Sequence, residues 1–125
     1  MKVLVLEDDK WFADSLYANL ERGSEVRICY NPEKVFNIIE KWWPDVLLAD
    51  VILGAKNLFV LLNEIQSYTD TRVLPIVILS TAAQQIEIED VAQYNVRKVL
   101  DKAEITPSKL CKVLREVIGE WKERA

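Results

Sequence analysis

Three adjacent carboxylates, Glu7, Asp8 and Asp9, follow the apolar run VLVL near the start of the chain. Two like charges about 4 Å apart repel by about 4 kcal/mol at an effective dielectric constant near 20. A helix start, a solvated turn and a metal site are the candidates that would explain such a cluster. Asp9 is interpreted as the cap of a helix that begins near Lys10. Because one helix start needs only one capping side chain, Glu7 and Asp8 are assigned to a metal.

Three further polar side chains stand at the ends of apolar runs. Asp50 follows VLLA, Ser80 follows IVIL, and Lys102 comes directly after VRKVLD. Taken singly, they are typical of a turn aspartate, a hydroxyl bonded to local backbone and a solvated lysine. Carboxylates without a cationic partner favour a hard divalent cation, and Mg²⁺ fits best because it takes few protein ligands. A hydroxyl and a lysine across the site would meet an anion such as phosphate, which predicts phosphoryl transfer to a carboxylate.

Short apolar runs predict the strands that carry these side chains. Continuous runs are typical of strands buried on both faces of a parallel sheet, and mixed runs fit the edges of a sheet. The continuous runs are 3–6, 46–49 and 76–79, and the mixed runs are 25–30 and 96–101.

Amphipathic stretches between the strands predict helices, because their apolar residues recur every three or four positions. Asn31-Pro32 and Thr106-Pro107 are typical helix starts, with a capping side chain before a proline. The stretch 83–93 has the weakest helical pattern. The stripes are Phe12, Leu16 and Leu20; Val35, Ile38, Ile39 and Trp42; Leu58, Leu61, Leu62 and Ile65; and Leu110, Val113, Leu114, Val117, Ile118 and Trp121.

Five alternating β-α units predict an α/β fold, a doubly wound (βα)5 flavodoxin-like sheet of strand order 2-1-3-4-5 with helices on both faces. In this order a ligand site lies beyond the carboxyl ends of the first and third strands, where the winding reverses. The acidic cluster and Asp50 stand at those two ends, so we expect them to be neighbours.

Composition narrows the functions that the chain can have. Its 125 residues fit one domain, 1–125, and the absence of histidine excludes His-based catalysis and His-ligated metals. A net charge of −4 without a dense basic run argues against direct binding of nucleic acid. No segment is long and apolar enough to span a membrane, so a cytoplasmic location is expected, with Cys29 and Cys111 as buried thiols.

The whole chain resembles the receiver domain of two-component response regulators (the CheY-like fold). The matching residues are the acidic pair Glu7-Asp8, the phosphoacceptor position Asp50, the hydroxyl position Ser80 and the lysine position Lys102. Each motif is weak alone, but their order at successive strand ends is specific. The resemblance implies a Mg²⁺ cofactor and phosphoryl transfer from a sensor histidine kinase or a phosphotransfer protein.

The resemblance also implies a ligand set for the metal. In the family, the second acidic residue and the phosphoacceptor bind Mg²⁺ directly, together with the backbone carbonyl two residues after the phosphoacceptor. These positions are Asp8, Asp50 and Ile52, and Glu7 completes the acidic pair.

The chain departs from the family pattern at several positions. Ala103 replaces the usual proline after Lys102, and a cis peptide bond there would cost about 3 kcal/mol or more without proline. Val99 stands where an aromatic residue usually switches rotamer on activation. Ile52 and Ala82, the positions that tune dephosphorylation, lack polar side chains, so we expect slow loss of the phosphoryl group.

The leading prediction is therefore a phosphorylation-activated switch, not a turnover enzyme, that signals through a changed protein-interaction face. The alternative is a receiver-like interaction module that works without phosphorylation. A Mg²⁺-dependent aspartyl phosphatase is disfavoured because Asp50-Val51-Ile52 lacks the second aspartate of a D-x-D motif. A downstream protein partner, an output domain outside this sequence and a phosphorylation-dependent homodimer all remain open.

Overall fold

The computed structural model describes residues 1–20, 23–50, 55–81 and 88–124. Five parallel strands form one sheet in the order β2-β1-β3-β4-β5, which confirms the predicted fold and strand order. The strands are β1 (Lys2–Leu6), β2 (Glu25–Cys29), β3 (Val46–Asp50), β4 (Ile76–Ser80) and β5 (Val96–Asp101).

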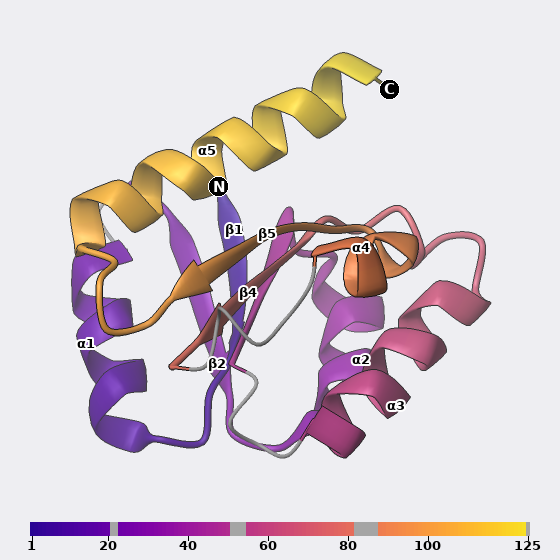
Figure 1. Cartoon of the computed structure of the whole chain (residues 1–125), viewed down its shortest axis with the longest axis horizontal. Coiled ribbons are helices and arrows are strands. Elements are labelled where there is room, and N and C mark those ends of the chain that lie inside the picture. The colour runs from indigo at the N-terminus through magenta and orange to yellow at the C-terminus, as the bar shows by residue number, and fades with distance from the viewer. Residues whose placement is uncertain (21–22, 51–54, 82–87, 125) are drawn as a thin grey trace.

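Helices cover both faces of the sheet, with α1 and α5 on one side and α2 and α3 on the other (Figure 1). They are α1 (Lys10–Leu20), α2 (Pro32–Trp42), α3 (Ala55–Ser67), α4 (Ile88–Val91) and α5 (Pro107–Arg124), and the 3-10 helix η3 (Ala92–Tyr94) follows α4. The prediction of one α-helix through residue 93 is wrong at its end. After Val91 the α-helix tightens into the 3-10 helix η3, and Asn95 is the residue that caps its end. The left-handed backbone of Asn95 (φ 63°) stops the helix.

Alternate residues of the central strands enter two apolar clusters. Leu4 and Leu6 of β1 pack against α2 and α3, whereas Val3 and Val5 pack against α1 and α5. A fully buried aliphatic side chain of this kind stabilises the fold by about 1.5–3 kcal/mol. Because β1, β3 and β4 are buried on both faces, their carboxyl ends are held in a rigid frame.

The predicted helix starts are confirmed at both proline positions. Asn31 Oδ1 accepts the Glu33 N–H at 3.0 Å, and Pro32 is the first residue of α2. Thr106 Oγ1 accepts the Lys109 N–H at 3.3 Å at the start of α5. These caps satisfy backbone donors that have no partner inside the first helical turn.

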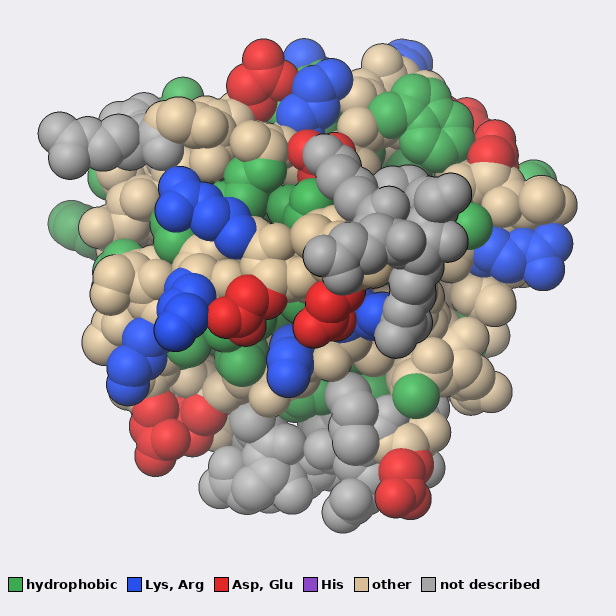
Figure 2. Space-filling view, turned by 90° about the horizontal axis from the view of Figure 1, so that it is seen from above, with side chains coloured by type: hydrophobic (Ala, Val, Ile, Leu, Met, Phe, Trp, Pro, Cys, Tyr) green, Lys and Arg blue, Asp and Glu red, His purple; other side chains and the backbone are tan. Residues whose placement is uncertain are grey.

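The surface has the mixed character that the composition indicates. Basic and acidic side chains are interspersed on the face seen from above, the side that carries α5, and they form no single basic stripe there (Figure 2). Cys29 is buried as predicted, but Cys111 is only partly buried, and both thiols are free. Within the described ranges, no helix combines the length and hydropathy needed to cross a bilayer.

Candidate functional site

The strand register brings the predicted polar residues to one edge of the sheet. Leu6 pairs with Ala49, so the next residues, Glu7 and Asp50, stand side by side at the carboxyl ends of β1 and β3. Ser80 ends β4 and pairs with Asp101, the last residue of β5. The switch point in strand order therefore lies where the sequence predicts it.

Three carboxylates at this edge form a cluster suited to a cation. Glu7, Asp8 and Asp50 each offer one carboxylate oxygen, and these oxygens lie within 4.8 Å of one another. Glu7 and Asp50 are buried, whereas Asp8 is exposed. Oxygen donors at this spacing, with one side open to solvent, fit a hard divalent cation such as Mg²⁺, which keeps several of its waters.

Lys102 enters the cluster directly, which corrects the prediction that the carboxylates have no cationic partner. Its Nζ donates to Glu7 Oε1 at 3.2 Å, to Glu7 Oε2 at 3.0 Å and to Asp50 Oδ2 at 2.9 Å. The Lys102 side chain is only 8% exposed. Three carboxylates and one ammonium carry a formal net charge of −2 when all are ionised, which matches one divalent cation.

Burial and neighbouring charges shift the pKa values of Glu7 and Lys102. Burial raises the pKa of the Glu7 carboxyl from 4.5 to about 7; the neighbouring Asp50 carboxyl adds to the rise, and hydrogen bonds from Asp9 and Lys102 oppose it. Burial alone would lower the pKa of the Lys102 ammonium, but its bonds to Asp50 and Glu7 outweigh burial and raise that pKa above 10.5. Lys102 therefore stays charged at neutral pH, while Glu7 is close to its midpoint.

Asp9 has the capping role that the sequence predicts. Its Oδ1 accepts the Phe12 N–H at 3.3 Å, and its carbonyl accepts the Ala13 N–H at 2.9 Å, at the start of α1. The Asp9 N–H also donates to Glu7 Oε1 at 3.0 Å. The turn after β1 thus both starts the helix and fixes the buried Glu7 carboxylate.

Phe12 belongs to the site, although the sequence assigns it only to a core stripe. The Lys102 Nζ lies 4.0 Å from the centroid of the Phe12 ring, well within the range of a cation–π contact. No motif in the sequence signals this contact, because it joins two residues that are 90 positions apart and that only the fold brings together.

The loop after β5 holds Lys102 without the family's proline. No cis peptide bond occurs among the described residues, so the Lys102–Ala103 bond is trans. Asp101 Oδ1 accepts the Ala103 N–H at 2.9 Å, and the Lys102 N–H donates to the Ser80 carbonyl at 2.9 Å. Ser80 itself is buried, and Val99 packs partly buried against the apolar cluster beneath α2 and α3.

Some predicted positions lie outside the described residues. These are Ile52, whose carbonyl is the predicted third ligand, and Ala82. The described part of the predicted site therefore comprises Glu7, Asp8, Asp50, Ser80 and Lys102.

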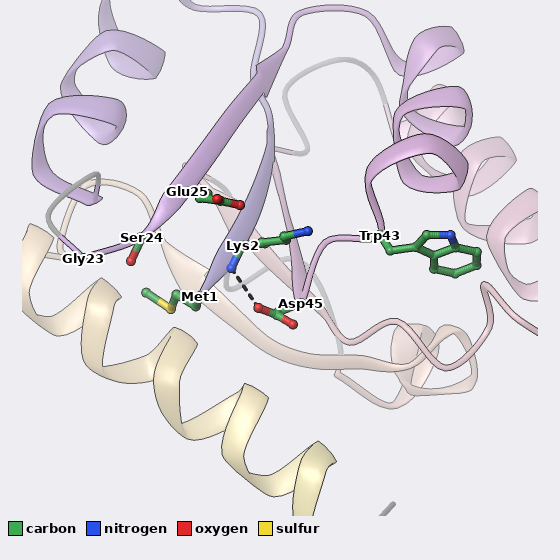
Figure 3. Close-up of a pocket in the computed structure, with 7 residues that line it drawn as sticks. All are labelled: Met1, Lys2, Gly23, Ser24, Glu25, Trp43 and Asp45. Carbon is green, nitrogen blue, oxygen red and sulfur yellow. Dashed lines mark hydrogen bonds between the residues drawn. The ribbon is translucent and has the colours of Figure 1, made fainter.

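A separate cavity of about 640 Å³ opens at the opposite edge of the sheet. There the Lys2 N–H donates to Asp45 Oδ2 at 2.8 Å, and the Trp43 indole points away from this pair (Figure 3). The cavity is formed where β1, β2 and β3 begin, so it shares no residue with the acidic cluster. The chemistry-bearing residues thus gather at the carboxyl edge, where the described carboxylates cluster.

The fold is an α/β doubly wound sheet, and its switch point brings together an acidic cluster that could hold a metal ion, the buried Ser80 and Lys102. The chain belongs to the response regulator receiver domain family, whose model matches residues 3–115. It is therefore a receiver domain of two-component signalling, a class that works with sensor kinases and output domains.

Solved structures with the same fold cover nearly the whole chain. A sensor protein from Polaromonas sp. JS666 is 23% identical with a TM-score of 0.86, and the match covers 96% of this chain and 97% of that one. A CheY-like receiver domain protein from Methanospirillum hungatei JF-1 is 19% identical with a TM-score of 0.83, covering 99% and 98%. The receiver domain of a sensor histidine kinase from Pseudomonas aeruginosa PAO1, solved with a magnesium ion coordinated in its active site cleft, is 24% identical with a TM-score of 0.81, covering 94% and 97%.

Proposed function

We propose that this chain is a phosphorylation-activated switch in which Asp50 accepts a phosphoryl group. The observation that carries the proposal is the bonding of Lys102 to both Asp50 and Glu7 beside the exposed Asp8. A buried ammonium held against an acceptor carboxylate is placed to neutralise the charge of an arriving phosphoryl group. The magnesium ion in the cleft of the related Pseudomonas domain supports the same use of the acidic cluster.

In the proposed step, an oxygen of the Asp50 carboxylate forms a bond to phosphorus while the bond from phosphorus to the donor breaks. The leaving group, the imidazole of a kinase phosphohistidine or a small carboxylate, keeps the bonding electron pair. Glu7, Asp8 and Asp50 would hold Mg²⁺, which supplies positive charge for the phosphoryl oxygens. Lys102 supplies a second positive charge, and the hydroxyl of Ser80, which is buried at the end of β4, would bind the phosphoryl group after transfer.

Asp50 is then a stoichiometric acceptor and not the nucleophile of a turnover enzyme. We propose slow loss of the phosphoryl group, because neither Ile52 nor Ala82 offers a polar side chain to orient water. A fast return to the unmodified mass in a phosphodonor-free chase would contradict this part. We propose that the domain works in the cytoplasm, where kinase phosphodonors are present. In that compartment its two free thiols, Cys29 and Cys111, would stay reduced.

The test is intact mass after incubation with Mg²⁺ and acetyl phosphate. We expect one added phosphoryl group on the parent and on Asp45→Asn, the matched control at the opposite edge of the sheet, and none on Asp50→Asn. Addition to Asp50→Asn would place the acceptor elsewhere. No addition to the parent, together with Mg²⁺-dependent stabilisation, would leave a metal-binding interaction module that works without phosphorylation.

A further inference from the structure

The ring of Phe12 lies against the same Lys102 ammonium that donates to Glu7 and Asp50. We propose that Phe12 is a positioning residue, which holds the Lys102 ammonium over the acceptor carboxylate through a cation–π contact. This role rests on the proposed function of Asp50 and adds to it a residue on α1 that supports the lysine.

The geometry distinguishes this contact from ordinary packing. The Lys102 Nζ lies 4.0 Å from the ring centroid while it donates to Glu7 and Asp50. Because the lysine side chain is 8% exposed, little water competes for the ammonium. An aromatic face attracts a cation most strongly when the cation is desolvated, whereas an aliphatic side chain of similar size offers no such attraction.

The ring has a fixed position from which to act. The Phe12 N–H donates to Asp9 Oδ1 in the first turn of α1, and the side chain packs against the apolar cluster between the sheet, α1 and α5. Lysine, in contrast, carries its charge on a flexible four-carbon stem. A rigid aromatic surface next to that stem restricts where the ammonium can go.

This restriction matters when the phosphoryl group arrives. Lys102 must then share or give up its bond to Asp50 Oδ2 in favour of a phosphoryl oxygen. The contact with Phe12 is independent of which oxygen accepts the bond, so it keeps the ammonium in place during the exchange. Without the ring, the lysine has to be ordered in the transition state, and phosphorylation becomes slower.

The experiment replaces Phe12 with mono-, di- and trifluorophenylalanine, which preserve shape while they withdraw electrons from the ring face. Phe12→Leu is the extreme case. Matched substitutions at Phe36, which pairs with Tyr68 on the other side of the sheet, serve as the control. Two readouts are compared: the phosphorylation rate with acetyl phosphate and Mg²⁺, and the ¹H–¹⁵N signal of the Lys102 ammonium in metal-free protein.

We expect the phosphorylation rate to fall stepwise with fluorination and by about three- to tenfold in Phe12→Leu. The Lys102 ammonium signal should weaken in the same order, and the Phe36 series should leave both readouts unchanged. If only Phe12→Leu is impaired, the ring merely fills space and the proposal is overturned; equal rates and signals in all variants would also overturn it. If the parent accepts no phosphoryl group, the proposed function fails, while the ammonium signal still tests the contact.

Discussion

The Lys102 Nζ lies 2.9 Å from Asp50 Oδ2, although the two residues are 52 positions apart in the chain. The same nitrogen bonds to both carboxylate oxygens of Glu7, so one buried cation joins the ends of β1, β3 and β5. Burying an ion pair costs desolvation of both partners, which favourable geometry only partly offsets. The desolvation cost at this site is therefore high, and we expect substitution of one of its charged residues to change the free energy of unfolding strongly.

Removal of the lysine should destabilise the metal-free protein. In Lys102→Met, Glu7 and Asp50 remain buried without their cation, and we expect the free energy of unfolding to fall by roughly 3 kcal/mol. Urea unfolding at pH 8 without Mg²⁺ measures this change. The control is Lys98→Met on β5, the strand that precedes Lys102, where the lysine is exposed and the loss should be small. Equal effects of the two variants would contradict a structural role for the buried ammonium.

The raised pKa of Glu7 predicts a pH-dependent stability with a definite sign. The folded protein binds the Glu7 proton more tightly than the unfolded chain does, because the pKa rises from 4.5 to about 7 on folding. The stability from this group is thus present at low pH and is lost as the pH rises from about 4.5 through 7.

The variant Glu7→Gln isolates this contribution from the other carboxyl groups. Relative to the parent, it should gain stability between pH 5 and pH 8 without metal, by a few kcal/mol at most, since one pKa unit corresponds to about 1.4 kcal/mol. Denaturant unfolding of both proteins at the two pH values gives the difference. A difference that does not change with pH would show that Glu7 titrates normally.

Magnesium should stabilise the folded domain through Asp8. A ligand that binds only the folded state adds about 1.4 kcal/mol at ten times its dissociation constant. We expect MgCl₂ to raise the melting temperature of the parent and to have little effect on Asp8→Asn. Asp9→Asn is the matched control, because asparagine keeps the helix cap and the cluster loses no ligand. If only Asp9→Asn lost the response to MgCl₂, the metal ligand would be Asp9 and not Asp8.

Asn95 lies outside the site, and we expect it to contribute to the free energy of unfolding. Its side-chain nitrogen donates to the carbonyls of Val73 and Leu74 at 3.1 and 3.0 Å, and its own carbonyl accepts the Ile76 N–H. Its backbone is left-handed, with φ 63°. Asn95→Ala loses these two hydrogen bonds and the one that Asn95 Oδ1 accepts from Arg97 Nη1, and it strains the backbone. We therefore expect a loss of about 2–3 kcal/mol in the free energy of unfolding. Asn95→Gly avoids the strain and should lose roughly 1 kcal/mol less; identical losses would mean that the conformation carries no strain.

Most of the fold could be predicted from local patterns. Runs such as VLVL and IVIL predict buried strands, and the caps at Asn31 and Thr106 are read from two adjacent residues each. Because parallel strands bring their carboxyl ends to one edge, the proximity of Glu7 and Asp50 also follows from the strand order. These inferences need only periodicity and topology.

The contacts inside the site could not be predicted in the same way. Whether Lys102 faces a phosphate or turns inward to Asp50 depends on side-chain geometry that no spacing encodes. The ring of Phe12 fits the apolar stripe of α1 equally well with or without a lysine above it. Likewise, the end of the helical segment before β5 depends on the left-handed turn at Asn95, which tertiary hydrogen bonds stabilise.

The hydrogen bond between Lys102 and Glu7 spans 95 positions of the chain. During synthesis the acceptor Asp50 emerges from the ribosome well before Lys102, and a chain that ends before β5 has an acceptor but no lysine. Under the proposed function, such an incomplete molecule is a poor phosphate acceptor. Within that proposal, Asp50 becomes a competent acceptor only after β5 has joined the sheet and brought Lys102 to it.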